Sequence, residues 1–284
     1  MTNGQLYGKV AIVTGAAGGF GRVLVGALLK EGASVCGLDV TRHQLDELSA
    51  GIPSIERIRL RTQVVDISDY GACEWAVQVA IREWGGVHIL INNAALGMGI
   101  IRADHMRVPV DIMEITPQMW QRFVAVNFTG AWNMTRASVP IMRSQKWGRI
   151  IDITTSFFTM LRGGFQPYGA CKAGLEAMAA AHAKEFEGSG ITVNVVVPGG
   201  PANTPMVTPE SGFARADLVQ PEVMAPPIVW LSSEAADRIT GNRYVASHWD
   251  TLLAPAQAEA KCRAPIAWPG LAQSPIWPGG RPPA

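Results

Sequence analysis

The chain alternates short apolar runs with longer amphipathic stretches over most of its length. The apolar runs are rich in β-branched residues and have the length of buried parallel strands, as in Val10–Thr14 and Ile191–Val197. Seven strands are predicted, near residues 9–14, 34–39, 58–65, 88–92, 149–154, 191–197 and 243–247. Helices between successive strands give a mostly parallel sheet with helices on both faces. The pattern therefore predicts a single doubly wound α/β domain over residues 1–250.

Composition excludes several other classes of protein. The 284 residues are 48% hydrophobic, carry a net charge of +1 and contain no run of like charges, so neither nucleic acid nor an anionic membrane surface is indicated as a partner. No stretch approaches the roughly twenty apolar residues of a spanning helix. The first apolar run lacks a preceding basic region, so it is not expected to be a signal peptide.

Cysteine and histidine usage gives two further expectations. The four cysteines, at positions 36, 73, 171 and 262, have no CxxC spacing, which favours reduced thiols and a cytoplasmic protein. The five histidines form no metal-ligand pattern, and we expect no catalytic metal.

A glycine-rich turn follows the first strand. Gly15, Gly19 and Gly21 have a G-x-x-x-G-x-G spacing that includes Phe20, and an amphipathic helix over residues 23–30 comes next. Glycines at a strand-to-helix turn let the backbone approach a pyrophosphate, and the helix N-terminus offers free N–H groups to the anion. This segment predicts the dinucleotide-binding unit of a Rossmann-type sheet.

An acidic residue ends the second predicted strand. Asp39 lies eighteen residues after Gly21, where a carboxylate can accept hydrogen bonds from ribose hydroxyls and would repel a 2′-phosphate. Neither Gly18 nor Val40 offers a basic group to such a phosphate. The sequence therefore favours NAD over NADP, although Arg42 is a flexible cation that can reach a phosphate.

Tyr168 and Lys172 are the most informative pair for chemistry. They lie four residues apart, so one helix face carries both side chains. A nearby ammonium favours the phenolate and is expected to lower the pKa of the tyrosine. Tyrosine then becomes an acid or base near neutral pH. Cys171 is turned away from that face and is interpreted as a packing residue.

Together these motifs resemble the short-chain dehydrogenase/reductase family over residues 7–247. Thr14–Gly21 is similar to its cofactor loop, and Tyr168 with Lys172 matches its catalytic pair. The resemblance implies that Asp66, followed by Ile67, contacts the adenine. It further implies that Asn127 holds a water for proton relay, and that Lys172 also bonds the nicotinamide ribose.

Three further segments extend the resemblance along the chain. Residues 92–95 match an Asn-Asn-Ala-Gly segment that contributes Asn93 and Ala94, with Ala95 in place of the usual glycine. Pro198 and Gly199 match a turn beside the nicotinamide. Thr204 matches a threonine that contacts the carboxamide or phosphates, in a register made uncertain by one extra residue. The family also implies a homodimer or homotetramer with helices near 116–143 and 167–188 at the interface.

One catalytic position departs from the family pattern. Counting back thirteen residues from Tyr168 reaches Thr155 where the family usually has serine. Its hydroxyl can donate to a substrate oxygen, and Ser156 takes that role if the strand end is shifted by one residue. Counting favours Thr155, and both alternatives remain open at this stage.

Two segments exceed a minimal version of the fold. Residues 96–115 form a long connection after the fourth strand, where loops line the ligand crevice. Residues 251–284 form a tail whose prolines include those at 255, 265, 269, 275 and 278, with tryptophans at 268 and 277. Proline opposes a regular helix there, whereas the tryptophans indicate docking on the core or on a neighbouring subunit. Residues 244–249 replace the family's usual Asp-Gly-Gly turn, which puts its C-terminal oligomer contact in doubt.

These observations predict reversible hydride transfer between NAD and a secondary alcohol or ketone. An apolar or aromatic substrate is suggested by side chains near the expected site. They are Phe157, Phe158, Met160, Phe165, Met206, Val207 and Phe213. Two alternatives remain: an NADPH-dependent carbonyl reductase, and a nucleotide-binding regulator that retains the fold without catalysis.

Overall fold

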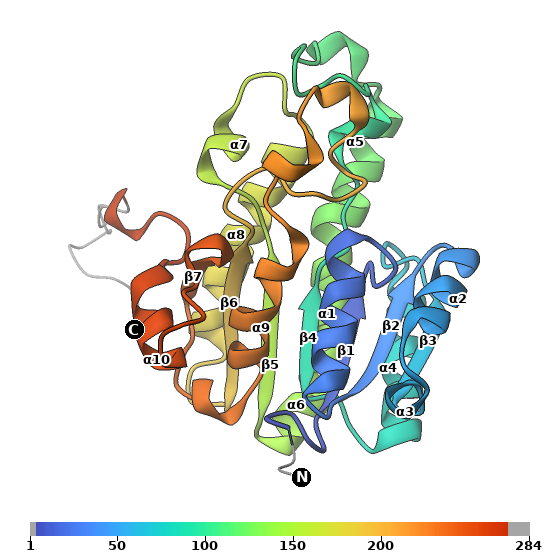
Figure 1. Ribbon diagram of the computed structural model, residues 1–284, viewed down its shortest axis with the longest axis vertical. Helices are drawn as coiled ribbons and strands as arrows, with labels where there is room; N and C mark the ends of the chain where they lie inside the picture. Colours follow the sequence, from blue (N-terminus) through green and yellow to red (C-terminus); the bar gives the residue numbers. More distant parts are fainter. Residues whose placement is uncertain (1–3, 272–284) are drawn as a thin grey trace, which may run out of the picture.

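The structure is a computed structural model and describes residues 4–271. Its centre is one sheet in the order β3-β2-β1-β4-β5-β6-β7-β8 (Figure 1). The strands are β1 (Val10–Thr14), β2 (Ser34–Asp39), β3 (Leu60–Val64), β4 (Ile89–Asn92), β5 (Gly148–Ile153), β6 (Ile191–Val197), β7 (Asn242–Val245) and β8 (Arg263–Pro265). Strands β1 to β7 pair in parallel, and β8 pairs antiparallel with β7. The predicted doubly wound, mostly parallel sheet is confirmed, with eight strands in place of seven.

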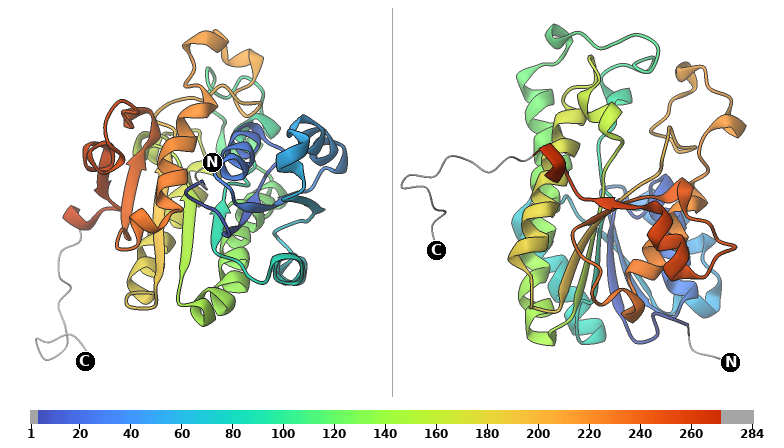
Figure 2. Two further views of the ribbon diagram at one scale, coloured as in Figure 1. Left: turned by 60° about the horizontal axis from the view of Figure 1, so that its bottom comes forward. Right: turned by 90° about the vertical axis from the view of Figure 1, so that its left-hand side faces the viewer.

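Helices cover both faces of the sheet (Figure 2). One face is covered by α1 (Gly19–Lys30) and α9 (Ala225–Leu231), and the other by α4 (Tyr70–Trp84), α6 (Gly130–Gln145) and α8 (Tyr168–Glu185). The remaining helices are α2 (Arg42–Gly51), α3 (Ser54–Arg57), α5 (Pro117–Val124), α7 (Phe157–Leu161) and α10 (Pro255–Cys262). None of the helices in residues 4–271 is long and apolar enough to cross a bilayer.

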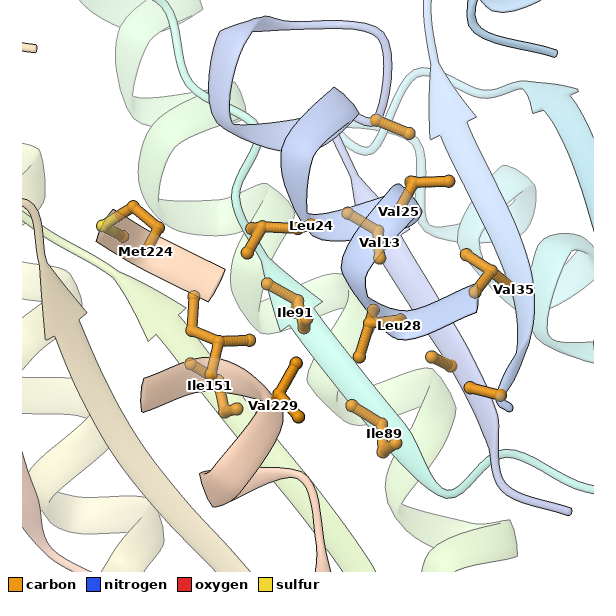
Figure 3. Close-up of a cluster of buried hydrophobic side chains, with 14 of the residues drawn as sticks. Val13, Leu24, Val25, Leu28, Val35, Ile89, Ile91, Ile151, Met224 and Val229 are labelled. Carbon is orange, nitrogen blue, oxygen red and sulfur yellow. The ribbon is translucent and has the colours of Figure 1, made fainter. Parts of the chain in front are cut away.

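Two apolar cores separate the sheet from its helices. Side chains alternate along β1, so Val13 packs under α1 while Ile12 packs on the opposite face. Figure 3 shows the first core, in which Leu24 and Leu28 of α1 lie beside Val13 and Ile91. Each fully buried leucine of this kind contributes about 2 kcal/mol to folding. The cores fix the sheet, and the carboxyl ends of its parallel strands then meet at one edge.

The connections after β4, β5 and β6 all lie beyond that edge, at the top of Figure 1. They comprise residues 93–116, 154–167 and 198–224. Residues 198–224 contact residues 93–116 directly. Met206 lies against Gly97, where an added Cβ would come within 2.4 Å of it, and the Thr208 hydroxyl donates to the Ala103 carbonyl. The candidate site therefore lies beneath two loops that contact each other.

The C-terminal segment is the main difference from the sequence prediction. A helix was not expected among its prolines, yet α10 begins at Pro255, because the first helical position needs no N–H donor. Strand β8 follows and ends at Pro265, on a sheet edge where proline is tolerated. Ala258 is fully buried, so the described part of the tail docks on the chain's own core. Trp277 lies outside the described residues.

Smaller corrections concern strand ends. The third strand was predicted from residue 58 but begins at Leu60, because the short helix α3 and a turn occupy the residues before it. The seventh was predicted to end at 247 but ends at Val245, where the chain turns into a single 3-10 turn, Ala246–His248. The fifth ends at Ile153, one residue before the predicted end.

Candidate active site

The glycine-rich turn has the tight geometry that its sequence predicts. Gly15 has a φ of +61°, and a Cβ there would lie 2.8 Å from the Ala94 backbone. A Cβ on Gly21 would lie 2.1 Å from the Gly15 carbonyl oxygen. Helix α1 starts at Gly19 without a side-chain cap, so its first turn presents backbone N–H groups at the end of β1. Phe20 is partly buried against the core below. This cradle suits a phosphate group.

Asp39 is fixed beside this turn at the end of β2. Its two carboxylate oxygens accept hydrogen bonds from the backbone N–H groups of Ala17, at 3.1 Å, and Val40, at 2.8 Å. Each oxygen retains acceptor capacity, which a ribose diol can use. Arg42, the cation considered for a 2′-phosphate, is exposed on α2 and lies 3.8 Å from Asp46. Its charge already has an acidic neighbour.

The segment after β4 closes the other side of the turn. The Asn93 side chain donates to the carbonyls of Thr14, at 2.9 Å, and Gly15, at 3.0 Å. The backbone N–H groups of Asn93 and Ala94 both donate to the Thr14 hydroxyl at 3.0 Å. Ala95 has no positive φ, so the exchange of glycine for alanine is tolerated there.

Asp66 and Ile67 lie after β3, at the same edge of the sheet. The Asp66 carboxylate accepts from the backbone N–H of Ser68 at 2.9 Å and from its hydroxyl at 2.7 Å. Ile67 is buried against Gly130, where a Cβ would approach the Ile67 side chain to 2.6 Å. These two residues therefore form a structured turn on the adenine side expected from the resemblance.

The structure distinguishes the two hydroxyls after β5. The Thr155 side chain lies close enough to the Tyr168 phenol to lower its pKa as a hydrogen-bonding partner. The Ser156 hydroxyl instead caps α7, accepting from the Thr159 backbone N–H at 3.1 Å and lying 2.9 Å from the Thr159 hydroxyl. Strand β5 has already ended at Ile153, so both side chains are free of strand alternation. The arrangement places Thr155, and not Ser156, against Tyr168.

The expected lowering of the tyrosine pKa by Lys172 is not found. Desolvation raises the pKa of Tyr168 to about 12, while the hydrogen bond with Thr155 acts in the opposite direction. Lys172 does share its helix face, but its Nζ lies 6.0 Å from the centre of the Tyr168 ring and donates to the Ile153 carbonyl at 2.7 Å. The ammonium is turned toward the sheet, so the phenol is protonated at neutral pH.

Lys172 is almost completely buried, which lowers its pKa to about 8. A second buried group, missed from the sequence, faces it. Burial raises the pKa of Asp152 to about 6, and Asn92 donates to its carboxylate at 2.7 Å. A lone acid inside the apolar run of residues 150–153 was the available signal. The two buried charges favour each other's ionised forms.

Asn127 lies in a π-helical turn, Ala125–Thr129, between α5 and α6. Its side-chain oxygen accepts from the Leu96 N–H at 2.7 Å and its amide donates to the Leu96 carbonyl at 2.9 Å. The side chain thus ties the helix to the loop after β4. Each of these two atoms makes one hydrogen bond, so the second lone pair of the oxygen and the second N–H of the amide remain available to a water.

The turn after β6 meets the rest of the site. Gly199 has a φ of +105° and a Cβ there would overlap Ser247, so glycine is needed after Pro198. Thr204 packs on Gly19, where a Cβ would lie 2.5 Å from the threonine methyl group. The extra residue in this loop therefore still allows Thr204 to reach the glycine-rich turn.

The apolar side chains considered as substrate lining do not form one surface. Phe165 and Met160 are buried, and Phe165 belongs to a small core with Met98 and Phe123. Phe157 packs on the C-terminal segment, with its ring 5.5 Å from that of Trp268. Phe158 is exposed, as is Phe213 to a lesser degree. Of this set, Met206 is the residue that crosses between the two loops.

The four cysteines are all buried and free, and burial raises the pKa of Cys171 to about 11, which suits a packing role. Residues 4–271 contain no cluster of three or more side chains suited to holding a metal ion.

Comparison with known proteins places the chain in a family. The model for the short chain dehydrogenase family matches residues 9–213, and the chain belongs to this family of oxidoreductases, which act on carbonyl or CH–OH groups with a nicotinamide cofactor.

Its relatives include reductases and a dehydrogenase. A 3-oxoacyl-(acyl-carrier-protein) reductase of Thermotoga maritima is 30% identical over 84% of this chain and 95% of its own length. A D-beta-hydroxybutyrate dehydrogenase of Cupriavidus necator is 27% identical over 84% of this chain and 95% of its own length. The crystal structure of a 3-ketoacyl-(acyl-carrier-protein) reductase from Brucella melitensis complexed with NADH matches with a TM-score of 0.71 and 26% identity, covering 84% of this chain and 96% of that chain.

Proposed function

We propose that this protein is an NAD-dependent oxidoreductase that interconverts a secondary alcohol and a ketone. The observation that carries the proposal is the meeting of Thr155, Tyr168 and Lys172 at the carboxyl end of β5. The residues present suit this cofactor. The glycines of the turn have no side chains that would keep a pyrophosphate from the backbone, and the Asp39 carboxylate beside the turn can still accept hydrogen bonds. NAD supplies a hydride acceptor or donor when bound.

The chain's own residues handle the proton. The Thr155 hydroxyl bonds the substrate oxygen and holds it near the Tyr168 phenol. A protonated Tyr168 donates its proton to the carbonyl oxygen during reduction and takes it back during oxidation. A water held at Asn127 links the buried Lys172 to solvent for proton exchange. Asp152 keeps Lys172 charged in a buried position, because opposite charges favour each other's ionised forms.

NAD is proposed over NADP on the geometry of Asp39. Its carboxylate is held by the backbone of Ala17, so it cannot move far from the ribose position without losing that hydrogen bond. A 2′-phosphate would meet this negative charge.

The substrate is proposed to carry an apolar or aromatic body. Support comes from Met206 between the loops and from the small apolar core around Phe123 and Phe165, against which Tyr168 packs. Relatives named for 3-oxoacyl thioesters and for hydroxybutyrate make short β-oxo and β-hydroxy acyl compounds worth including beside aryl ketones and polyols. Turnover of polyols alone would contradict this proposal.

The test is a panel of alcohols and ketones with NAD(H) and NADP(H), followed at the nicotinamide absorbance. Tyr168→Phe should lower turnover by about 10²- to 10⁴-fold, the usual contribution of general acid–base catalysis, and leave NAD affinity within about twofold. Exposed Tyr7 is the matched control, and Tyr7→Phe should retain full activity. Tight NAD binding without turnover of any substrate would favour the non-catalytic regulator, and a higher kcat/KM with NADPH would favour the carbonyl reductase.

A further inference from the structure

A buried ion pair lies directly behind the candidate catalytic threonine. Glu176 of α8 is completely buried and Arg243 of β7 nearly so, and the two side chains form a salt bridge. Glu176 follows Lys172 by four residues, so it continues the helix face of the catalytic pair. Nothing in the proposed proton transfer uses either residue.

The guanidinium of Arg243 reaches both threonines that follow β5. Its Nη2 donates to the Thr155 carbonyl at 2.7 Å, and its Nη1 donates to the Thr154 hydroxyl at 3.3 Å. That hydroxyl donates in turn to Glu176 at 2.8 Å. The planar fork of arginine fixes the direction of each hydrogen bond, which a lysine ammonium does not.

Thr155 needs such a restraint because it lies beyond the strand. Ile153 paired with Val196 is the last registered pair between β5 and β6, and the Thr154 N–H makes the next backbone bond, to Val196 at 3.3 Å. Residue 155 follows these bonds and precedes the first turn of α7. The hydrogen bond from Arg243 therefore holds the backbone of residue 155 beyond the end of the sheet.

The C-terminal segment covers this pair. The Ala267 N–H donates to Glu176 at 3.4 Å, and Ala267 holds a φ of +58°, a left-handed conformation that costs alanine roughly 1 kcal/mol. The Arg243 guanidinium lies 4.2 Å from the centre of the Phe157 ring, on which Trp268 also packs. The strained conformation of Ala267 is retained where its N–H meets the buried Glu176 carboxylate, which indicates a role for this hydrogen bond.

We propose that Glu176 and Arg243 are positioning residues that set the Thr155 hydroxyl against Tyr168, and that residues 263–268 hold this pair in place. The inference rests on the proposed function, because Thr155 must bond the substrate oxygen for its position to matter. Residues 263–268, which exceed the minimal fold, then help to hold the active site in place. A buried pair suits this role, because its charges tolerate little displacement without partners.

The first test is a double-mutant cycle on turnover. Arg243→Lys keeps a charge beside Glu176 but loses the fork, and it should lower kcat by about 10- to 100-fold with the KM for NAD unchanged, since small misplacements cost that much. In a Thr155→Ala background the same change should have no further effect on kcat. Exposed Arg238, shortly before β7, provides the control, and Arg238→Lys should change neither parameter. Equal loss of kcat in both backgrounds would overturn the inference, because the pair would then act on the fold as a whole.

A second measurement does not depend on turnover. Amide hydrogen exchange of the peptide spanning residues 153–161 should quicken about tenfold in Arg243→Lys and in Trp268→Ala, while peptides from α1 stay unchanged. Trp268 is only partly buried, so its variant tests the inference even if the arginine variant does not fold. Unchanged exchange in the folded variants would refute the positioning role. Absence of turnover in the wild-type protein would instead refute the proposed function, and exchange would still decide whether the pair orders residue 155.

Discussion

Lys172→Met should raise stability while nearly abolishing turnover. Burial lowers the pKa of Lys172 from 10.5 to about 8, which at ~1.36 kcal/mol per pH unit means that folding disfavours its charged form by about 3 kcal/mol. Methionine has a similar shape and removes that penalty. Loss of the hydrogen bond to Ile153 offsets about 1 kcal/mol.

Asp152 contributes an opposing effect. Without the ammonium, its pKa moves further upward, which costs stability near neutral pH. The net expectation is a gain of up to about 2 kcal/mol in the free energy of unfolding at pH 7.

The sign of the pH dependence is fixed by proton binding. Between pH about 8 and 10.5 the unfolded wild-type chain binds more protons at Lys172 than the folded one, so wild-type stability rises with pH in that window. Below the window the penalty is complete. The advantage of the methionine variant should therefore be largest near pH 6 and shrink toward pH 10.

Urea unfolding followed by tryptophan fluorescence measures both proteins across roughly pH 6 to 10, at one protomer concentration. Lys184 lies on the same helix and is exposed, so Lys184→Met should differ from wild type by less than about 0.5 kcal/mol. A Lys172→Met protein that is less stable than wild type near neutral pH, or a difference that does not change with pH, would refute the reasoning.

Three further predictions concern the cofactor and the proton. Asp39→Ala should raise the KM for NAD by about tenfold or more, and that for NADP less, as measured by initial rates; an unchanged NAD:NADP ratio would remove Asp39 from the site. Gly21→Ala should weaken NAD binding in calorimetry by more than about tenfold, whereas Gly26→Ala, which meets nothing within 4 Å, should bind normally and stabilise α1 by about 0.5–1 kcal/mol. Because the pKa of Tyr168 is raised to about 12, oxidation should quicken as pH rises through the alkaline range while reduction should not, and an oxidation rate independent of pH would contradict this.

Local patterns predicted the fold well. Apolar runs gave all seven parallel strands, because strands buried on both faces require continuous hydrophobic sequence. The eighth strand escaped prediction, since residues 263–265 are short and their pairing depends on β7 lying beside them. Helix α10 was not predicted either, because Pro255 was expected to oppose a helix, whereas proline is tolerated at the first helical position.

The sequence predicted those features of the site that depend on residue spacing, but not those that depend on burial in the folded protein. The i, i+4 relation placed Tyr168 and Lys172 on one face, but their pKa values follow from desolvation and from the Ile153 carbonyl, neither of which has a local sequence signal. Thr155 and Ser156 could not be separated before the helix cap at Ser156 was seen. Glu176 and Arg243 are 67 residues apart and become partners only through the sheet.

The antiparallel strand β8 also determines whether the edge of the sheet can pair with another polypeptide. Its pairing satisfies backbone groups of β7 that would otherwise face outward as a template for another polypeptide. The new border is three residues long and ends in proline, so it offers few donors for recruitment. A second copy of the chain could extend the sheet through β7 only after peeling β8 away, and peeling would withdraw the Ala267 contact from Glu176 as well. Continuous intermolecular sheet growth on this side of the molecule would therefore separate Ala267 from Glu176.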